Sequence, residues 1–229
     1  MRINKSQYSF RITLLLISIL FVACSEKKNK QETKNTAVVQ ESEIVDENSL
    51  FNGKTLDGWK ITQYGTEGPV LVSDGKIVLN YGDGCTGITW EKDFPKVNYE
   101  VTLEAQKTSG NDFFCGMTFP VGKEPCTLII GGWGGTTVGL SSINWMDASE
   151  NQTTTYMTFE KDQWYRISLL VHADTIRAAI DDEVVVNYVK DKYDELSVRP
   201  EVDLSRPFGI ASWSTAAELK NIRMVRIDD

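Results

Sequence analysis

The chain has 229 residues and a formal net charge of −8, from 32 acidic and 24 basic side chains. Its basic residues form no patch or motif typical of a nucleic-acid-binding protein. A single histidine and four widely spaced cysteines give no zinc-ligand pattern. We therefore expect an acidic globular protein with no metal site, no cofactor and no nucleic-acid partner.

The N-terminus indicates export. Residues 1–11 are basic and contain no acid, residues 12–22 are almost entirely apolar, and Ala23 precedes Cys24. This order is typical of a secretory signal peptide, and the apolar run is too short to span a bilayer. Ala23-Cys24 also resembles a bacterial lipobox, in which the cysteine is lipidated. We expect a signal peptide over residues 1–23 and a lipoprotein held to the membrane only through Cys24, in the periplasm or on the outer-membrane surface.

The next segment, residues 24–48, is polar and rich in charge, and it contains no aromatic residue. Such a composition buries too little apolar surface to offset the entropy cost of ordering the chain. We predict a disordered tether over residues 24–48. Residues 49–229 are then one domain, long enough to build its own core.

The pattern over residues 49–229 predicts an all-β domain. Residues 99–106 alternate apolar and polar side chains, which is typical of a half-buried strand. Turn residues separate the other predicted strands, which cover residues 59–63, 70–72, 76–80, 87–90, 113–118, 128–130, 138–140, 164–172, 175–180, 184–188, 208–212 and 217–227. Residues 193–198 are the one weak helix candidate. Many short strands at regular spacing predict a two-sheet antiparallel β-sandwich or jelly roll.

Strand alternation also predicts a core between the two sheets. The side chains that we expect to be buried there are Tyr99, Val101, Leu103, Ile129, Tyr165, Ile167 and Leu169. Three cysteines fall in the domain, so at most one disulfide forms and one thiol stays free. The sequence leaves open how they pair: Cys85, Cys115 and Cys126.

Residues 126–140 place Trp133 between two pairs of glycines, with a short apolar run on each side. Glycines around a large aromatic residue allow another backbone or a ligand to come close. One interpretation is a binding surface centred on Trp133. The alternative is a bulged pair of core strands, in which Trp133 is an ordinary packing residue.

The loop that follows, residues 142–152, combines Asn144, Trp145, Asp147 and Glu150. Sugars bind with their C–H face on an aromatic ring while amides and carboxylates hold the hydroxyl groups. We therefore predict a carbohydrate ligand. The predicted binding residues are Trp133, Asn144 and Trp145.

Residues 49–59 read Ser-Leu-Phe-Asn-Gly-Lys-Thr-Leu-Asp-Gly-Trp and resemble the opening motif of the 3-keto-disaccharide hydrolase domain family. The turn at residues 181–183 and the segment 218–226 extend this likeness loosely over residues 49–227. The resemblance implies a jelly roll of the concanavalin A-like or laminin G-like type. It also implies an exported, carbohydrate-active protein that cleaves or binds oxidised (3-keto) disaccharides or glycosides.

Two regions depart from that family. Residues 125–128 and 209–216 lack its usual glutamate and histidine-glycine elements, so the resemblance transfers no catalytic set. A 3-keto sugar needs one base to remove the acidified C2 hydrogen, and one cation or hydrogen-bond donor for the developing enolate. The candidate bases are Asp112, Asp147, Glu150 and His172, and the candidate enolate partners are Arg166, Lys123 and Asn144. From these we predict Asp147, Glu150 and Arg166 as catalytic residues.

Several alternatives remain open. The polar face of residues 164–172, which includes Arg166, either lines a concave cleft or faces solvent. Glu201 and Asp203 have the spacing of paired carboxylates on a strand, but neighbouring prolines favour a solvated loop. The function is either that of a glycoside hydrolase or lyase acting on 3-keto sugars, or that of a non-catalytic laminin G-like carbohydrate-binding module.

Overall fold

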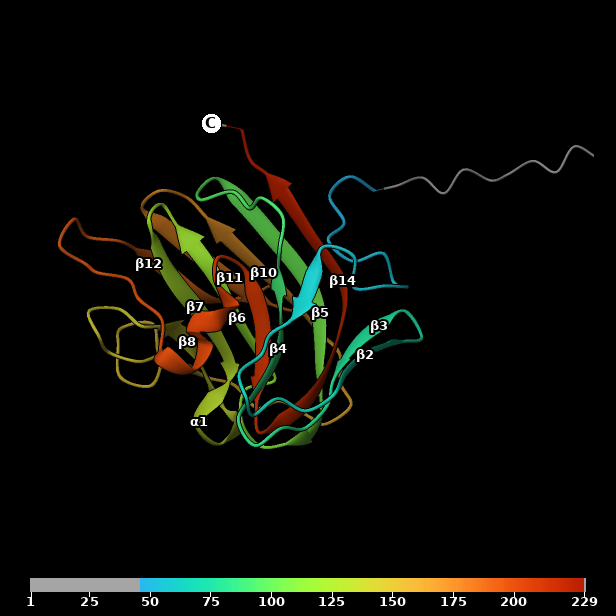
Figure 1. Ribbon diagram of the computed structural model, residues 1–229. Helices are drawn as coiled ribbons and strands as arrows, with labels where there is room; N and C mark the ends of the chain where they lie inside the picture. Colours follow the sequence, from blue (N-terminus) through green and yellow to red (C-terminus); the bar gives the residue numbers. More distant parts are fainter. Residues whose placement is uncertain (1–45, 229) are drawn as a thin grey trace, which may run out of the picture. The chain divides into compact units, whose positions relative to one another are not determined.

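The computed structural model describes residues 46–228, so the predicted signal peptide, Cys24 and nearly all of the predicted tether lie outside the described residues. The described chain forms two seven-stranded antiparallel sheets (Figure 1). No helix within residues 46–228 is long and apolar enough to cross a membrane. The predicted all-β sandwich is confirmed.

The first sheet, here called sheet 1, has the strand order β1-β4-β13-β6-β7-β8-β9. In chain order its strands are β1 (Trp59–Ile61), β4 (Cys85–Trp90), β6 (Cys115–Val121), β7 (Glu124–Gly131), β8 (Thr137–Ser141), β9 (Thr155–Tyr156) and β13 (Gly209–Trp213). A single turn, α1 (Gly132–Gly135), joins β7 to β8, and the 3₁₀-helix η1 (Pro200–Ser205) precedes β13.

The second sheet, sheet 2, has the order β12-β11-β10-β5-β14-β3-β2. Its strands are β2 (Val70–Ser73), β3 (Lys76–Leu79), β5 (Tyr99–Gly110), β10 (Tyr165–Val171), β11 (Thr175–Ile180), β12 (Glu183–Val189) and β14 (Thr215–Arg226). Each predicted strand corresponds to one strand of the two sheets, and only the two-residue β9 was not predicted. The predicted helix at residues 193–198 is wrong, because Leu196 instead forms a β-bridge with Ile143.

The core lies between the sheets. Leu103 of β5 faces Ile167 of β10 in direct register, and both are almost fully buried. All seven predicted core residues are buried, but Ile129 lies on the opposite side of sheet 1 from Leu128 and Ile130. Side chains alternate along a strand, and β7 is covered on both faces, so burial alone does not identify which residues face the other sheet. The three domain cysteines are buried free thiols.

Candidate functional site

The glycine-rich connection between β7 and β8 raises Trp133 out of the sheet. Trp133 has φ +45°, and Gly131, Gly134 and Gly135 also have positive φ angles. Such left-handed conformations cost most residues about 1–2 kcal/mol and cost glycine almost nothing, which explains the glycines around Trp133. The Trp133 side chain remains 40 % exposed, so Trp133 is not an ordinary core residue.

A groove of about 180 Å³ lies beside Trp133, on the face of sheet 1 that points away from the inter-sheet core. Its floor is formed by Thr127 and Ile129 of β7 and Ser141 of β8. Its walls come from the segment before β6, from α1, from the start of η1 and from the end of β13. They consist of Asp112, Phe113, Trp133, Arg199, Glu201, Val202 and Trp213.

One wall is built by close packing on a glycine. Phe113 lies so near Gly116 of β6 that a Cβ atom on Gly116 would be 2.8 Å from the Phe113 ring. The backbone N–H of Trp213 donates to the Phe113 carbonyl at 2.9 Å, and the two ring centroids are 6.5 Å apart. The absence of a side chain at position 116 therefore lets the two aromatic residues form one wall directly on the sheet.

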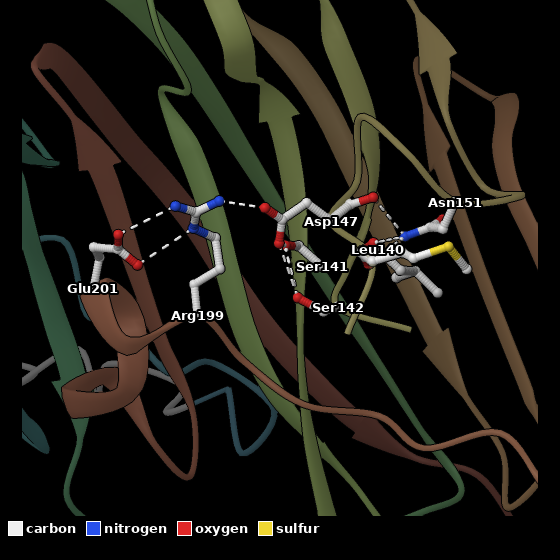
Figure 2. Close-up of polar contacts among 8 residues, drawn as sticks. Leu140, Ser141, Ser142, Asp147, Asn151, Arg199 and Glu201 are labelled. Carbon is white, nitrogen blue, oxygen red and sulfur yellow. Dashed lines mark hydrogen bonds and ion pairs between the residues drawn. The ribbon is translucent and has the colours of Figure 1, made fainter. Parts of the chain in front are cut away.

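Arg199 lies between two carboxylates, those of Asp147 and Glu201 (Figure 2). Its Nη1 donates to the Asp147 carboxylate, and its Nε and Nη2 donate to the two oxygens of Glu201 at 3.3 and 3.2 Å. The Asp147 carboxylate also accepts hydrogen bonds from the hydroxyls of Ser142 and Ser141, at 3.0 and 3.3 Å. The guanidinium is therefore held from two sides by carboxylates.

The buried side chain of Asn151 fixes the loop that carries Asp147. Its Nδ2 lies 2.7, 3.0 and 2.9 Å from the carbonyl oxygens of Leu140, Met146 and Asp147 (Figure 2). Its Oδ1 accepts hydrogen bonds from the backbone N–H and hydroxyl of Thr153. These contacts attach the Asp147 loop to the end of β8.

The pKa values of the two acids of the groove are shifted in opposite directions. Burial raises the pKa of Asp112, an effect that hydrogen bonds from neighbouring backbone N–H groups partly oppose. Hydrogen bonds from Arg199 lower the pKa of Glu201 below its ordinary value. Asp112 is therefore the stronger base of the two carboxylates, and Glu201 is the one that ionises more readily.

The structure separates the predicted catalytic residues. Asp147 does not line the groove itself, but it forms an ion pair with Arg199, which does. Glu150 lies on the same loop, but it is exposed and does not line the groove. Arg166 lies on β10 in sheet 2, on the solvent face, where it pairs with Asp182. The cleft interpretation of that polar face is therefore wrong: the groove lies on the other sheet.

The predicted binding residues are separated as well. Trp133 lines the groove, whereas Trp145 is 76 % exposed and does not line it. Asn144 instead donates to the Asp194 carboxylate at 2.7 Å, and accepts from the backbone N–H of Glu195 at 2.9 Å. Asn144 thus joins two loops, and Trp145 follows it at the tip.

Sequence reasoning assigned no role to Arg199, Trp213, Thr127 or Ser141, and it weighed Glu201 but favoured a solvated loop for it. Glu201 is exposed, as expected of a solvated segment, but it lies at the start of the 3₁₀-helix η1 and its carboxylate pairs with Arg199. Asp203, in the same helix, pairs with Arg206. Among residues 46–228 no group of three or more His, Cys, Asp or Glu side chains is arranged to hold a metal ion.

Comparison with known proteins gives one family match. The model of the 3-keto-alpha-glucoside-1,2-lyase-like domain matches residues 46–225. No curated protein matches the sequence significantly.

Similar solved structures share the fold. A putative glycosyl hydrolase from Parabacteroides distasonis has a TM-score of 0.50 and 15 % identity, over 78 % of this chain and 93 % of that chain. A protein of unknown function with a galectin-like fold from Bacillus subtilis has a TM-score of 0.52 and 10 % identity, over 74 % and 90 %. The Crh5 transglycosylase in complex with NAG has a TM-score of 0.50 and 14 % identity, over 76 % and 79 %.

Proposed function

Because this chain belongs to the 3-keto-alpha-glucoside-1,2-lyase-like domain family, we propose that it is a carbohydrate-active protein that cleaves 3-keto glycosides in the groove beside Trp133. One observation carries the proposal. The groove places Asp112, a carboxylate whose pKa is raised by burial, in the same aromatic-walled space as the cation Arg199.

Sugar binding would use the neutral part of the groove. The rings of Trp133 and Trp213 offer surfaces for the C–H face of a sugar, and Thr127 and Ser141 offer hydroxyls for hydrogen bonds. The volume of about 180 Å³ is smaller than the roughly 300–1,000 Å³ typical of drug-sized ligands, which suits one sugar ring better than a long chain.

The proposed reaction is an elimination. The 3-keto group acidifies the C2 hydrogen, and the Asp112 carboxylate takes this proton, so that the electron pair of the C2–H bond moves toward the C3 oxygen. That pair then forms the C1=C2 double bond while the C1–O bond breaks, and the departing oxygen takes a proton from water. A carboxylate with a raised pKa is a stronger base than an ordinary aspartate.

Arg199 would stabilise the developing negative charge on the C3 oxygen. A guanidinium has five N–H donors, and three of them are used by Asp147 and Glu201. The remaining donors can hydrogen-bond a ketone oxygen that becomes an enolate. The only histidine, His172, directly follows β10 of sheet 2, and its Nδ1 lies 3.2 Å from the Asn98 side chain. It does not line the groove, so the proposed base is a carboxylate.

A non-catalytic carbohydrate-binding module is the second candidate. The ion pairs of Arg199 with Asp147 and Glu201 favour it. A guanidinium whose charge is already balanced by two carboxylates stabilises an enolate less well. We also propose export and lipid attachment at Cys24, which the order of basic, apolar and small residues supports.

The experiment compares a native disaccharide with its 3-keto form. We expect release of monosaccharide from the keto form alone, together with a new ultraviolet absorbance from the conjugated enone. Asp112→Asn should lower turnover by roughly 10²–10⁴-fold, the usual contribution of a general base. Asp182→Asn is the matched control, since it removes a carboxylate from the exposed face of sheet 2.

Binding of both sugars without turnover would reject the enzyme and leave the binding module. Equal turnover by the wild type and Asp112→Asn would reject Asp112 as the base. If neither sugar binds, the groove is not a sugar site and both candidate functions fail.

A further inference from the structure

Acidic side chains outnumber cations around the groove. Among the described residues that line it, Asp112 and Glu201 are acidic and Arg199 is the one cation. Asp147 adds a third carboxylate through its ion pair with Arg199. Three carboxylates around one guanidinium leave an excess of negative charge when all of them are ionised.

The positive charge of Arg199 is also poorly accessible to a further anion. Asp147 occupies one edge of the guanidinium, and Glu201 occupies another with both oxygens. The ring of Trp133 lies against the group, with its centre 5.9 Å from the Arg199 Cζ atom. A neutral acceptor can still use a remaining N–H, but a ligand carboxylate would approach a cation whose charge is already balanced.

The floor of the groove supplies no compensating charge. Thr127, Ile129 and Ser141 are neutral. Cys85, in the apolar cluster with Phe113 and Ile129, has a pKa raised to about 12 by burial and by the charges of Glu201 and Asp112. The buried thiol therefore stays neutral, as expected in a region of negative potential.

We propose that the groove accepts uncharged sugar units and rejects sugars that carry a carboxylate or phosphate, such as uronates. This inference rests on the proposed sugar-binding role of the groove. It is compatible with the proposed elimination, because proton transfer moves one negative charge from Asp112 to the substrate and leaves the total charge of the groove unchanged. A uronate would add a charge from the moment of binding.

The test uses methyl glucoside and methyl glucuronide, which carry no 3-keto group, so binding is measured without turnover. Calorimetry or NMR titration with the protein at low salt should show at least about tenfold weaker binding of the glucuronide, as expected for like charges in a partly buried site. High salt should narrow the difference because it screens the repulsion.

Two variants identify the responsible charges. Asp147→Asn and Glu201→Gln each remove one carboxylate from Arg199, so each should improve glucuronide binding relative to glucoside binding. Asp182→Asn also removes one negative charge, but from an exposed pair on sheet 2, and it should leave the ratio unchanged. This control separates a local effect from a change in net charge.

Each outcome decides between the proposals. Glucuronide binding as tight as glucoside binding at low salt would overturn the charge proposal and leave the sugar groove intact. A difference that responds neither to salt nor to the two variants would mean steric discrimination, and would also overturn it. If neither glycoside binds, this inference fails, while the proposed cleavage is decided separately by the turnover of the 3-keto disaccharide.

Discussion

The ion pair between Arg199 and Asp147 can be tested as a device that positions the guanidinium. Asp147→Asn keeps the shape of the side chain and an oxygen that can accept from Ser142, but it removes the charge. Arg199 would still be held by Glu201, so the variant does not leave a cation without a partner. What changes is the second anchor of the guanidinium.

The structure sets the size of the effect. The side chains of Arg199 and Asp147 are 39 % and 22 % exposed, so solvent screens the pair in part. Hydrogen bonds to charged groups contribute about 1.5–3 kcal/mol, whereas exposed pairs contribute roughly 0.2–1 kcal/mol. Because the pair is partly exposed, we expect a value between these two ranges, a coupling energy of about 1 kcal/mol between the two side chains.

A double-mutant cycle measures this coupling. The proteins are the wild type, Asp147→Asn, Arg199→Gln and the double variant, each unfolded in urea and each titrated with methyl glucoside. The loss in the double variant should be smaller than the sum of the single losses by about 1 kcal/mol. Additivity within about 0.3 kcal/mol in both measurements would refute the positioning role, since independent sites behave in that way.

Leu103→Ala should lower the free energy of unfolding by about 2–5 kcal/mol in urea titration, and a loss below about 0.5 kcal/mol would contradict its place in the core. Trp133→Gly should be about 1 kcal/mol more stable than Trp133→Ala, because residue 133 has φ +45°, which strains alanine and not glycine. Both variants should lose sugar affinity, and equal stabilities would contradict backbone strain at this position. Because burial raises the pKa of Asp112, the folded state binds a proton more readily than the unfolded state. The free energy of unfolding should therefore fall as pH rises above 3.8, the ordinary pKa of an aspartate. Urea titrations at several pH values should show a smaller fall for Asp112→Asn, which has no carboxylate at this position. Mass spectrometry of the membrane fraction should find an acylated Cys24, and a mature N-terminus elsewhere would reject the lipoprotein assignment.

Most of the fold could be predicted because strand signals are local. The alternation over residues 99–106 reappears as β5, with Leu103 facing the core. Ile129 was predicted to lie between the sheets but lies on the outer side of sheet 1. Because β7 is buried on both faces, its apolar run does not show which residues face the other sheet. The helix predicted at residues 193–198 failed because Leu196 bridges Ile143, a contact between distant loops.

The site could be predicted only where its signal was local. The glycines around Trp133 marked a position that lines the groove, and Asp112 was among the candidate bases. Arg199 carried no such signal, since it meets Asp147 across 52 residues of chain. The role of Glu201 depends on Arg199, with which it pairs. Only the fold brings Arg199, the residue before η1, to the loop after β8 that carries Asp147.

Which sheet carries the groove depends on the side chains that point outward. On sheet 1 the outward positions of the central strands include Gly87, Gly116, Gly139 and Ala211. At Gly87 a Cβ atom would meet the neighbouring strand β13. At Gly116 it would lie 2.8 Å from Phe113, and at Gly139 it would lie 3.1 Å from the carbonyl oxygens of Ala148 and Thr153, so the loops that carry these residues rest directly on the strands. These loops then form the walls of a hollow.

Sheet 2 has the opposite pattern on its outer face. Glu104 pairs with Lys220 at 3.2 Å across β5 and β14, and Lys220 lies 4.0 Å from the centre of the Trp164 ring. Arg166 pairs with Asp182 on the same face. Long charged side chains that pair with each other cover the sheet, so neither a loop nor a bound sugar can rest on it. The alternation along β10 correctly predicted that Arg166 lies on a polar face. That face is covered by its own ion pairs, so it faces solvent and does not line a cleft. The small residues on the outer face of sheet 1 are the better sequence signal for a groove.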